Sequence, residues 1–330
     1  MHLSAPRPGP SNSIADVAGV AVGSAQDAAA MTGVSVVLAP GCVAAGVSAP
    51  GGAPGTRETE ALAPENLVGR AHAVVLAGGS VFGLAAADAV AADLSARGIG
   101  LRLAGADSGL AIPIVPAAVL HDLANGSAKD WGADPPYRRL GAQALAAALA
   151  GGPVALGRAG AGFGARAGLE AGGLGSASLD LGAGVSVGAL VAVNCCGSVR
   201  APGGGFWAAP LEHGGEFGGG PLPQRGAIEP FPADSRLPRL AGPAAATTIA
   251  VVAVTAMLTP AQCRRVAIMA HDGIARAVRP AHTPFDGDVV FALALPGPDA
   301  DAAAVARIGA AAADTLARAI ARGVWEASRP

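Results

Sequence analysis

The apolar residues of this chain gather in short β-branched runs that end at glycine. Two of these runs are Gly33–Gly41 (GVSVVLAPG) and His72–Gly79 (HAVVLAGG). Short apolar runs that are closed by turn residues are typical of buried strands. Alanines and leucines then recur at helical spacing over Phe82–Ala96, which predicts a helix. Gly79 and Ser80 would therefore lie at a strand-to-helix turn.

The middle of the chain contains weaker strand signals and then loses its pattern. Further strands are predicted at Pro153–Leu156, Ala177–Leu181 and Val185–Asn194. From Arg200 to Ala246 the sequence is rich in glycine and proline and has no periodicity. A segment of this length without regular structure is usually functional or disordered. We expect a surface linker that ends at the adjacent threonines.

From the threonine pair onward, the pattern alternates strand, helix, strand and helix. Thr259 and Gln262 form a capping box with Pro260 at the first helical position, a combination that starts helices. The two strands and the closing helix are predicted at Thr248–Ala256, Asp288–Leu295 and Asp299–Val324.

Composition limits the class of protein. The 330 residues are 52% hydrophobic, which suffices for a substantial core, and we expect a single domain over residues 1–330. The net charge of −2 argues against nucleic acid and anionic membranes as partners. No secretory signal or bilayer-length apolar stretch is visible, and the four cysteines have neither metal-type nor disulfide-framework spacing. We expect a reduced, cytoplasmic protein with no metal and no cofactor.

One glycine-rich motif has two interpretations. Gly160–Ala165 (GAGFGA) fits the dinucleotide-binding fingerprint in spacing. The residues that follow, RAGLEAGGLGSA, contain too much glycine for the helix that would hold the pyrophosphate. The motif therefore favours a glycine-rich loop over a cofactor site.

Three polar patterns could each carry chemistry or serve only the backbone. In FDGD, an extended chain would place Asp286 and Asp288 on one face, where two carboxylates orient an amine or share a proton. The alternative is an Asp-Gly turn before a strand. Asn194 ends a predicted strand and either donates to an oxyanion or tolerates a tight turn. Thr247 and Thr248 are either strand-edge residues or include a nucleophile.

Seven blocks along the chain, in this order, carry a family resemblance. They read GGAPGTRETE, NLVGRAHAVVLAGGSVFGLAAADAV, IPIVPAAVLHDL, GGLGSAS, GALVAVN, TTIAVVAV and MAHDGIARAVRPAHTPFDGDVVFAL. Together they resemble the L-aminopeptidase/D-esterase family, which also includes β-peptidyl aminopeptidases and nylon-oligomer hydrolases. The resemblance implies an α+β fold, a four-layer αββα sandwich. Its layering is similar to that of the N-terminal-nucleophile hydrolases and the ornithine acetyltransferases.

The resemblance also assigns roles to residues. Members of the family cut their own chain before a Ser or Thr, which then becomes the nucleophile. The matching bond here is Ala246–Thr247, which would divide the chain into fragments 1–246 and 247–330. Asn194 matches the oxyanion donor, and Asp286 and Asp288 match the acidic pair. Cleavage frees an α-amine with a pKa near ~8, which can act as the base for its own hydroxyl.

Other matching positions describe the surroundings of the nucleophile. The turn Gly78–Ser80 would form a substrate or oxyanion region, with backbone donors or as a wall of the pocket. Relatives usually have Asn or Gly before the nucleophile, where this chain has Ala246. Many also have a lysine where this chain has Ala171, and Arg166 is a candidate replacement.

The sequence therefore predicts a self-processing hydrolase with an N-terminal threonine, most simply an aminopeptidase acting on small amides or peptides. Two alternatives stay open. One is an unprocessed, catalytically silent member that binds a small ligand or serves in an assembly, and the other is an acyltransferase with the same threonine chemistry. The resemblance also implies a homo-oligomer.

Overall fold

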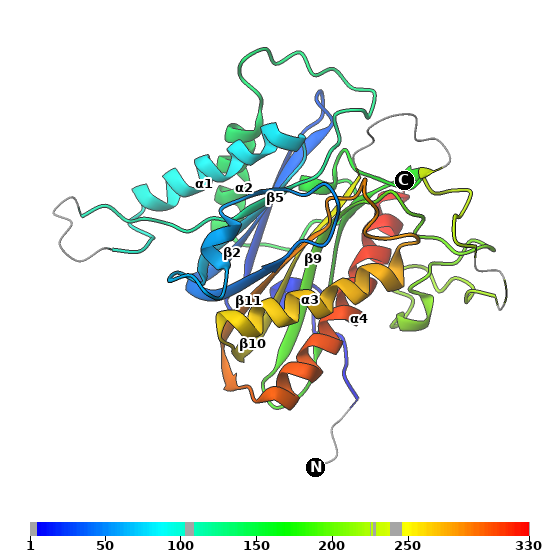
Figure 1. Ribbon diagram of the computed structural model, residues 1–330. Coiled ribbons are helices and arrows are strands. Elements are labelled where there is room, and N and C mark those ends of the chain that lie inside the picture. The colour runs from blue at the N-terminus through cyan, green and yellow to red at the C-terminus, as the bar shows by residue number, and fades with distance from the viewer. Residues whose placement is uncertain (1–4, 103–108, 225, 227–228, 238–245, 330) are drawn as a thin grey trace.

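A large mixed sheet forms the centre of the protein (Figure 1). The computed structural model describes residues 5–102, 109–224, 226, 229–237 and 246–329. Within them, the strand order is β3-β5-β4-β2-β11-β10-β9-β8, with β1 added to β2. The strands are β1 (Ala21–Asp27), β2 (Thr32–Ser48), β3 (Gly55–Arg57), β4 (Arg70–Ala77), β5 (Ala117–Val119), β8 (Gly173–Asp180), β9 (Ser186–Asn194), β10 (Thr247–Met257) and β11 (Val289–Asp299). A separate short pair is β6 (Arg166–Ala167) with β7 (Glu170–Ala171).

The long strand β2 joins two layers of this sheet. Its first half pairs with β1, with Val34 opposite Ala25, whereas its last residues pair with β11, with Ser48 opposite Val290. The pairing of β2 with β4 changes register between Leu38 and Val43. Such an irregularity bends a strand. The sheet therefore divides into one layer of β1, β4 and β5 and a second layer of β8 to β11.

Side-chain alternation along the strands identifies what covers each face. In β10, Ile249 and Val251 pack between the two layers, whereas Ala250 and Val252 pack against α3 (Pro260–Ala277) and α4 (Ala302–Ala327). In β4, Val74 and Leu76 face the other strand layer. Its alternate residues Val75 and Ala77 pack against α1 (Ala85–Ala96) and α2 (Tyr137–Ala150).

The predicted four-layer αββα sandwich is thus confirmed. In Figure 1 the helix pair α1 and α2 lies on one side of the strands and the pair α3 and α4 on the other. Short 3-10 turns connect the elements at Ile14–Asp16, Thr59–Leu62, Ser80–Leu84, Gly160–Gly162 and Ala209–Leu211. Among the helices of the described residues, none has the length and apolar character needed to cross a bilayer.

Several local predictions are confirmed. The capping box at α3 is present, because Thr259 Oγ1 accepts the Gln262 N–H at 3.2 Å and Gln262 Oε1 accepts the Thr259 N–H at 2.8 Å. Strands at the predicted positions appear as β4, β8, β9, β10 and β11. The motif at Gly160–Ala165 forms a 3-10 turn followed by the short strand β6, and not a helix.

One predicted strand is absent, one predicted helix begins later than expected, and one helix was not predicted. Pro153–Leu156 is not a strand, since only the next residue, Gly157, bridges to Leu174. The helix predicted from Phe82 begins as a 3-10 turn and becomes α-helical only at Ala85. The sequence analysis did not identify α2, although its buried residues Tyr137, Leu140 and Ala144 recur at helical spacing.

The glycine- and proline-rich segment is more than a surface linker. Phe206 and Phe217 from this segment are buried in the core beside α4, with ring centroids 5.5 Å apart in an edge-on arrangement. Edge-on aromatic pairs are a favourable packing geometry. The prediction of a surface linker is therefore wrong for this part, and residues 238–245 lie outside the described residues.

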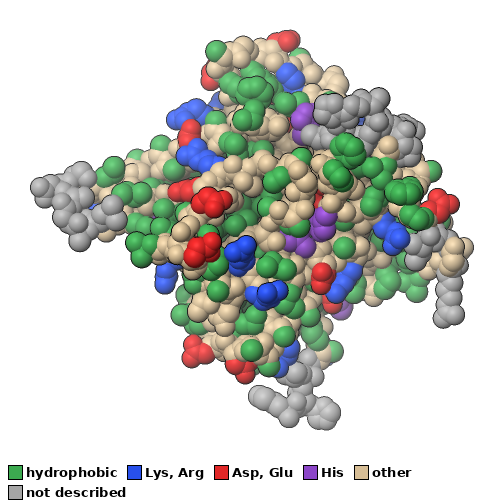
Figure 2. All heavy atoms as spheres, viewed as in Figure 1, with side chains coloured by type: hydrophobic (Ala, Val, Ile, Leu, Met, Phe, Trp, Pro, Cys, Tyr) green, Lys and Arg blue, Asp and Glu red, His purple; other side chains and the backbone are tan. Residues whose placement is uncertain are grey.

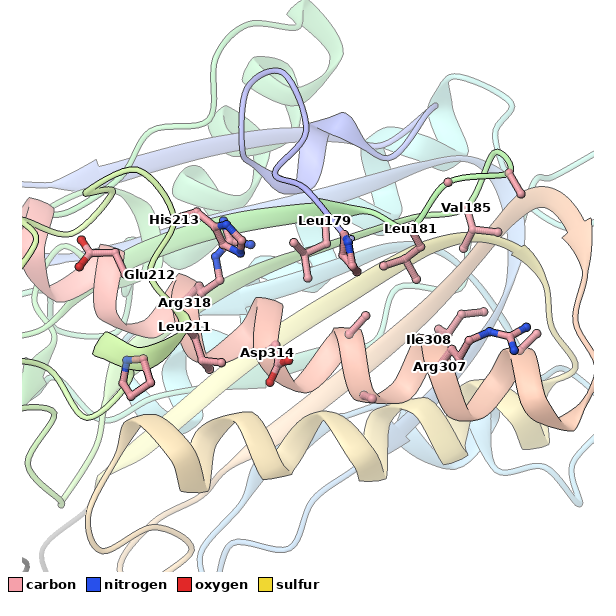
Figure 3. Close-up of a pocket in the computed structure, with 17 residues that line it drawn as sticks. Leu179, Leu181, Val185, Leu211, Glu212, His213, Arg307, Ile308, Asp314 and Arg318 are labelled. Carbon is pink, nitrogen blue, oxygen red and sulfur yellow. The ribbon is translucent and has the colours of Figure 1, made fainter. Parts of the chain in front are cut away.

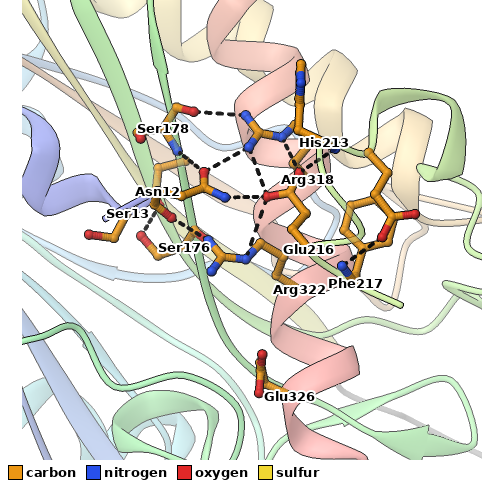
Figure 4. Close-up of polar contacts among 12 residues, drawn as sticks. Asn12, Ser13, Ser176, Ser178, His213, Glu216, Phe217, Arg318, Arg322 and Glu326 are labelled. Atoms are coloured by element: carbon orange, nitrogen blue, oxygen red, sulfur yellow. Dashed lines mark hydrogen bonds and ion pairs between the residues drawn. The ribbon is translucent and has the colours of Figure 1, made fainter. Parts of the chain in front are cut away.

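A buried ion pair ties this segment to α4 (Figure 4). Glu216 accepts from Arg318 Nε and from Asn12 Nδ2, both at 2.6 Å. The Arg318 side chain is 1% exposed and also donates to Ser178 O at 2.9 Å. A buried charge pair is tolerated only when such partners satisfy it, and loss of one partner leaves the other charge unpaired.

Removal of the Glu216 charge should therefore destabilise the protein strongly. We expect Glu216→Gln to lower the free energy of unfolding by about 3 kcal/mol, because Arg318 would stay buried without a counter-charge. Urea unfolding followed by circular dichroism measures this change. The control is Glu326→Gln, which breaks the exposed pair with Arg329 and should cost less than about 1 kcal/mol. Equal losses for the two variants would contradict the argument.

Candidate active site

Thr247 and Asn194 face each other across the pair of central strands β10 and β9. Thr247 is the first residue of β10, and Asn194, the last residue of β9, is its direct partner in the antiparallel register. Directly opposed residues present their side chains on the same face of a sheet. Ile249 and Ala192, two residues along each strand, both pack between the layers, so this face is the space between the two strand layers.

The peptide bond before Thr247 lies in a specific hydrogen-bond environment. The hydroxyl of Thr247 donates to the carbonyl oxygen of Ala246 at 2.5 Å, and the Gly287 N–H donates to the same oxygen at 2.8 Å. The Ala246 N–H donates to Phe285 O at 2.9 Å. The carbonyl that precedes the threonine is thus polarised by two donors, one of which is the adjacent hydroxyl.

The two predicted carboxylates lie beside this bond and are buried. Asp288 accepts the Thr248 N–H at 2.7 Å, and Asp286 accepts the N–H groups of Cys196 and Thr283, both at 3.0 Å. Ala246 pairs with Asp286 in a parallel bridge, which brings the backbone of Asp286 beside the Ala246–Thr247 bond. Among the hydrogen bonds of the described residues, neither carboxylate contacts the Thr247 hydroxyl.

Burial and neighbouring charges shift the pKa values of Asp286 and of two histidines, His282 and His271. Burial, together with the charge of Asp288, raises the pKa of Asp286. His282 binds Asp288 through Nδ1 at 2.7 Å, and this contact raises the pKa of His282 against the opposite effect of burial. The ring of His271 stacks edge-on against His282 at 4.9 Å, and burial lowers its pKa to about 4. Asp288 links His282 to the backbone of the threonine pair, since it accepts both from the Thr248 N–H and from the His282 ring.

The sequence analysis missed His282 and Arg236. His282 lies four residues before Asp286 in the quoted block AHTPFDGD, so its position in that block was the available signal. Arg236 comes from the segment without pattern and had no signal. Its Nη2 atom donates to Asn194 Oδ1 at 3.1 Å and to Asn194 O at 2.9 Å.

Within the part of the chain that the structure describes, the hydrogen bonds of Arg166 to the site come from its backbone. The Arg166 N–H donates to Asn194 Oδ1 at 3.0 Å, while the residue itself is exposed. The guanidinium group next to Asn194 therefore belongs to Arg236. Asn194 Nδ2 donates to His121 O at 3.1 Å, and an amide nitrogen has a second N–H for another acceptor.

The turn Gly78–Ser80 uses its backbone donors within the protein. Its three N–H groups donate in order to Gly33 O at 2.9 Å, Asp122 Oδ1 at 2.7 Å and Leu120 O at 2.9 Å. These bonds leave the turn without a free N–H for a substrate in this state. A role for the turn in shaping the substrate pocket stays a prediction.

The described residues line cavities elsewhere in the molecule. A cavity of about 590 Å³ lies along α4, between the end of β8 and the 3-10 turn Ala209–Leu211, with mainly apolar walls such as Leu179, Val185 and Ile308 (Figure 3). Thr247 is not among its lining residues and is only 4% exposed. With the Ala246–Thr247 peptide intact, the threonine hydroxyl is thus enclosed.

The surface charge is mixed on the face shown in Figure 2, where acidic and basic side chains are interspersed. Among the described residues, no group of three or more His, Cys, Asp and Glu side chains is arranged to hold a metal ion.

Comparison with known proteins identifies the family. The sequence model of peptidase family S58 matches residues 12–329. The chain belongs to peptidase family S58. As an S58 member it is a hydrolase, and the family resemblance inferred from the sequence is confirmed.

Relatives of this S58 chain have related names. An uncharacterized aminopeptidase of Mycobacterium tuberculosis is 45% identical to this chain. The alignment covers 96% of this chain and 94% of the relative. A 6-aminohexanoate-oligomer endohydrolase of Kocuria sp. is 31% identical and covers 84% of this chain and 73% of the relative.

Solved structures confirm the fold of the S58 chain. The β-aminopeptidase of Burkholderia sp. superposes with a TM-score of 0.67 at 24% identity, over 98% of this chain and 89% of that one. The L-aminopeptidase D-Ala-esterase/amidase of Ochrobactrum anthropi gives a TM-score of 0.67 at 22% identity, over 96% and 86% of the two chains. The latter is described as a variant of the Ntn hydrolase fold.

The pair of His282 and Asp288 makes stability depend on pH. The pKa of His282 is raised in the folded protein, so the stabilisation is fully present below the unfolded value of about 6.5 and is lost as the pH rises through the folded pKa. We expect the difference in free energy of unfolding between wild type and His282→Gln to shrink as the pH is raised above about 6.5. Urea titrations at a series of pH values measure this.

His271 provides a contrast of opposite sign. Burial lowers the pKa of His271 to about 4. The contribution of the neutral ring to folding stability is therefore fully present above about pH 6.5 and is lost as the pH falls toward 4. The difference between wild type and His271→Gln should therefore shrink on acidification. If the difference in free energy of unfolding follows the same pH trend for His282→Gln and His271→Gln, the opposite pKa shifts given for the two histidines are wrong.

Proposed function

We propose that this S58 chain is a self-processing aminopeptidase whose nucleophile is the hydroxyl of Thr247. The observation that carries the proposal is the environment of the Ala246 carbonyl, which accepts hydrogen bonds from both the Thr247 hydroxyl and the Gly287 N–H. The first contact places the hydroxyl beside the group that it would attack. The second provides a donor for the charge that would develop on the carbonyl oxygen.

Self-cleavage would then follow in two stages, transfer of the acyl group to the hydroxyl and hydrolysis of the resulting ester. Thr247 Oγ1 adds to the carbonyl carbon of Ala246, and the Gly287 N–H stabilises the negative oxygen of the tetrahedral intermediate. The C–N bond breaks, the hydroxyl proton passes to the departing nitrogen, and an ester joins Ala246 to Thr247. Water hydrolyses this ester, which leaves a carboxylate on Ala246 and a free amine and hydroxyl on Thr247.

The freed amine would serve as the base for the next reactions. An α-amine has a pKa of about 8, so a substantial fraction is neutral near pH 7 to 8 and can accept the proton of its own hydroxyl. Asp286 and Asp288 lie beside the cleaved bond, and the raised pKa of Asp286 makes the pair able to share a proton. We assign to these carboxylates the orientation of the amine.

The same hydroxyl would then cleave a substrate amide. It forms an acyl ester with the amino-terminal residue of the substrate, the remaining amine leaves with a proton, and water hydrolyses the ester. Asn194 faces Thr247 and has an N–H available for the oxyanion of this second reaction. Aminopeptidase activity is favoured over other amidase activities because the relatives at 45% identity carry that name.

The threonine pair offers a matched test of self-cleavage. Intact mass spectrometry of the wild-type protein should show the fragments Met1–Ala246 and Thr247–Pro330. Thr247→Ala should give only the full-length chain of 31.6 kDa. Thr248→Ala is the control, because the Thr248 side chain lies on the opposite face of β10 and should be dispensable for cleavage. A wild-type chain that stays uncut on long incubation contradicts the proposal and favours a silent S58 member.

A second test addresses the oxyanion donor during hydrolysis. Loss of a direct oxyanion donor typically lowers kcat by about 10²–10³. We expect this loss for Asn194→Ala, with initial rates on aminoacyl p-nitroanilides expressed per chain carrying a free Thr247 amine. Asn66→Ala removes an exposed asparagine and serves as the control. An unchanged kcat for Asn194→Ala would rule out the assigned role, and turnover of N-acetylated substrates at equal rates would rule out the aminopeptidase specificity.

A further inference from the structure

Arg236 reaches into the candidate site from the segment that precedes the nucleophile. Its backbone N–H is anchored to Cys196 O at 2.8 Å, two residues beyond Asn194. The Nη2 atom of the guanidinium donates to Asn194 O at 2.9 Å and to Asn194 Oδ1 at 3.1 Å, and it also contacts Arg166 O. One side chain therefore holds both the backbone and the side chain of Asn194.

These contacts determine which end of the Asn194 amide faces which neighbour. Oδ1 accepts from two donors, the Arg166 N–H at 3.0 Å and Arg236, whereas Nδ2 donates to His121 O at 3.1 Å. A flipped amide would turn its N–H groups toward two donors and its oxygen toward a carbonyl, losing every one of these bonds. The guanidinium thus contributes to keeping Asn194 in one orientation.

The charge of Arg236 reinforces this arrangement. The three acceptors of Nη2 in the described contacts are two backbone carbonyls and one amide oxygen, all of them neutral groups. A cation bound to the amide oxygen withdraws electron density and strengthens the N–H groups of the same amide as donors. Asn194 is only 1% exposed, so water does not reach the amide itself, whereas Arg236 is partly exposed and is also influenced by the charge of Asp286.

We propose that Arg236 is a positioning residue for the oxyanion donor Asn194, holding its amide with the N–H groups directed away from the guanidinium and toward the side of the reacting carbonyl. The proposal rests on the proposed function, because it requires Asn194 to act on a substrate bound at Thr247. The group that Asn194 would stabilise is the negatively charged oxygen of the tetrahedral intermediate formed from an amide substrate.

Replacement of the guanidinium should affect kcat more than KM. Arg236→Met keeps an unbranched chain without charge, and Arg236→Lys keeps the charge without the planar fork. We expect Arg236→Met to lower kcat about ten-fold, less than the ~10²–10³ for a direct donor, with KM changed less than three-fold. Arg236→Lys should be intermediate, and added guanidinium ion should restore part of the rate of Arg236→Met. Arg265→Met, which removes an exposed guanidinium from α3, is the matched control.

A double-mutant cycle tests whether Arg236 acts through Asn194. In the Asn194→Ala background, Arg236→Met should cause no further loss, because the group that it positions is absent. Additive losses, or a wild-type kcat for Arg236→Met, would overturn the proposal. All rates are referred to the chains with a free Thr247 amine, measured by mass, and the urea midpoint of each variant reports its folding.

The outcomes separate this inference from the proposed function. Wild-type protein that hydrolyses aminoacyl p-nitroanilides while Thr247→Ala does not would support the proposed function whatever Arg236→Met does. An active Arg236→Met variant in that case overturns the role of Arg236 alone. Processed wild-type protein without turnover overturns both.

Discussion

The hydrogen-bonded position of β10 in the middle of the sheet is the constraint on which the site depends. β10 is bonded on both edges, antiparallel to β9 and parallel to β11. At its first residues, this double pairing brings Asn194 opposite Thr247 and the Asp288 carboxylate onto the Thr248 N–H. A slip of one residue would exchange the two threonines between faces of the sheet. The register of the three strands thus brings the candidate residues together.

The same topology explains how a divided chain would stay together. β10 and β11 follow residue 246, but they lie between β2 and β9, which both precede it. A cut between Ala246 and Thr247 would remove one covalent bond and leave strand pairing intact on both sides. The buried pair of Glu216 and Arg318 adds a further contact between the segments before and after that bond. Cleavage would therefore change the local chemistry of the threonine more than the fold.

Much of the fold could be predicted from the sequence where one local pattern dominates. The strand from Thr247 is almost wholly apolar, and the box of Thr259 and Gln262 marks the start of α3. Prediction failed in two places. The helix α2 was missed although its buried residues recur at helical spacing. The glycine-rich segment has no local pattern that marks Phe206 and Phe217, whose burial depends on distant partners in the core beside α4.

By itself, the sequence determined the family, the strand and helix alternation after residue 246, and the set of Thr247, Asn194, Asp286 and Asp288 as the groups to consider. These features lie in local patterns and in the order of blocks along the chain. Only the tertiary structure decided that His282 and Arg236 join this set and that the N–H groups of Gly78–Ser80 are already bonded within the protein. For Arg236 and for the turn, the bonded partners lie far apart in the chain, and only strand register and side-chain packing bring them within hydrogen-bond distance. His282 lies six residues before Asp288, and the conformation of the intervening loop decides that contact.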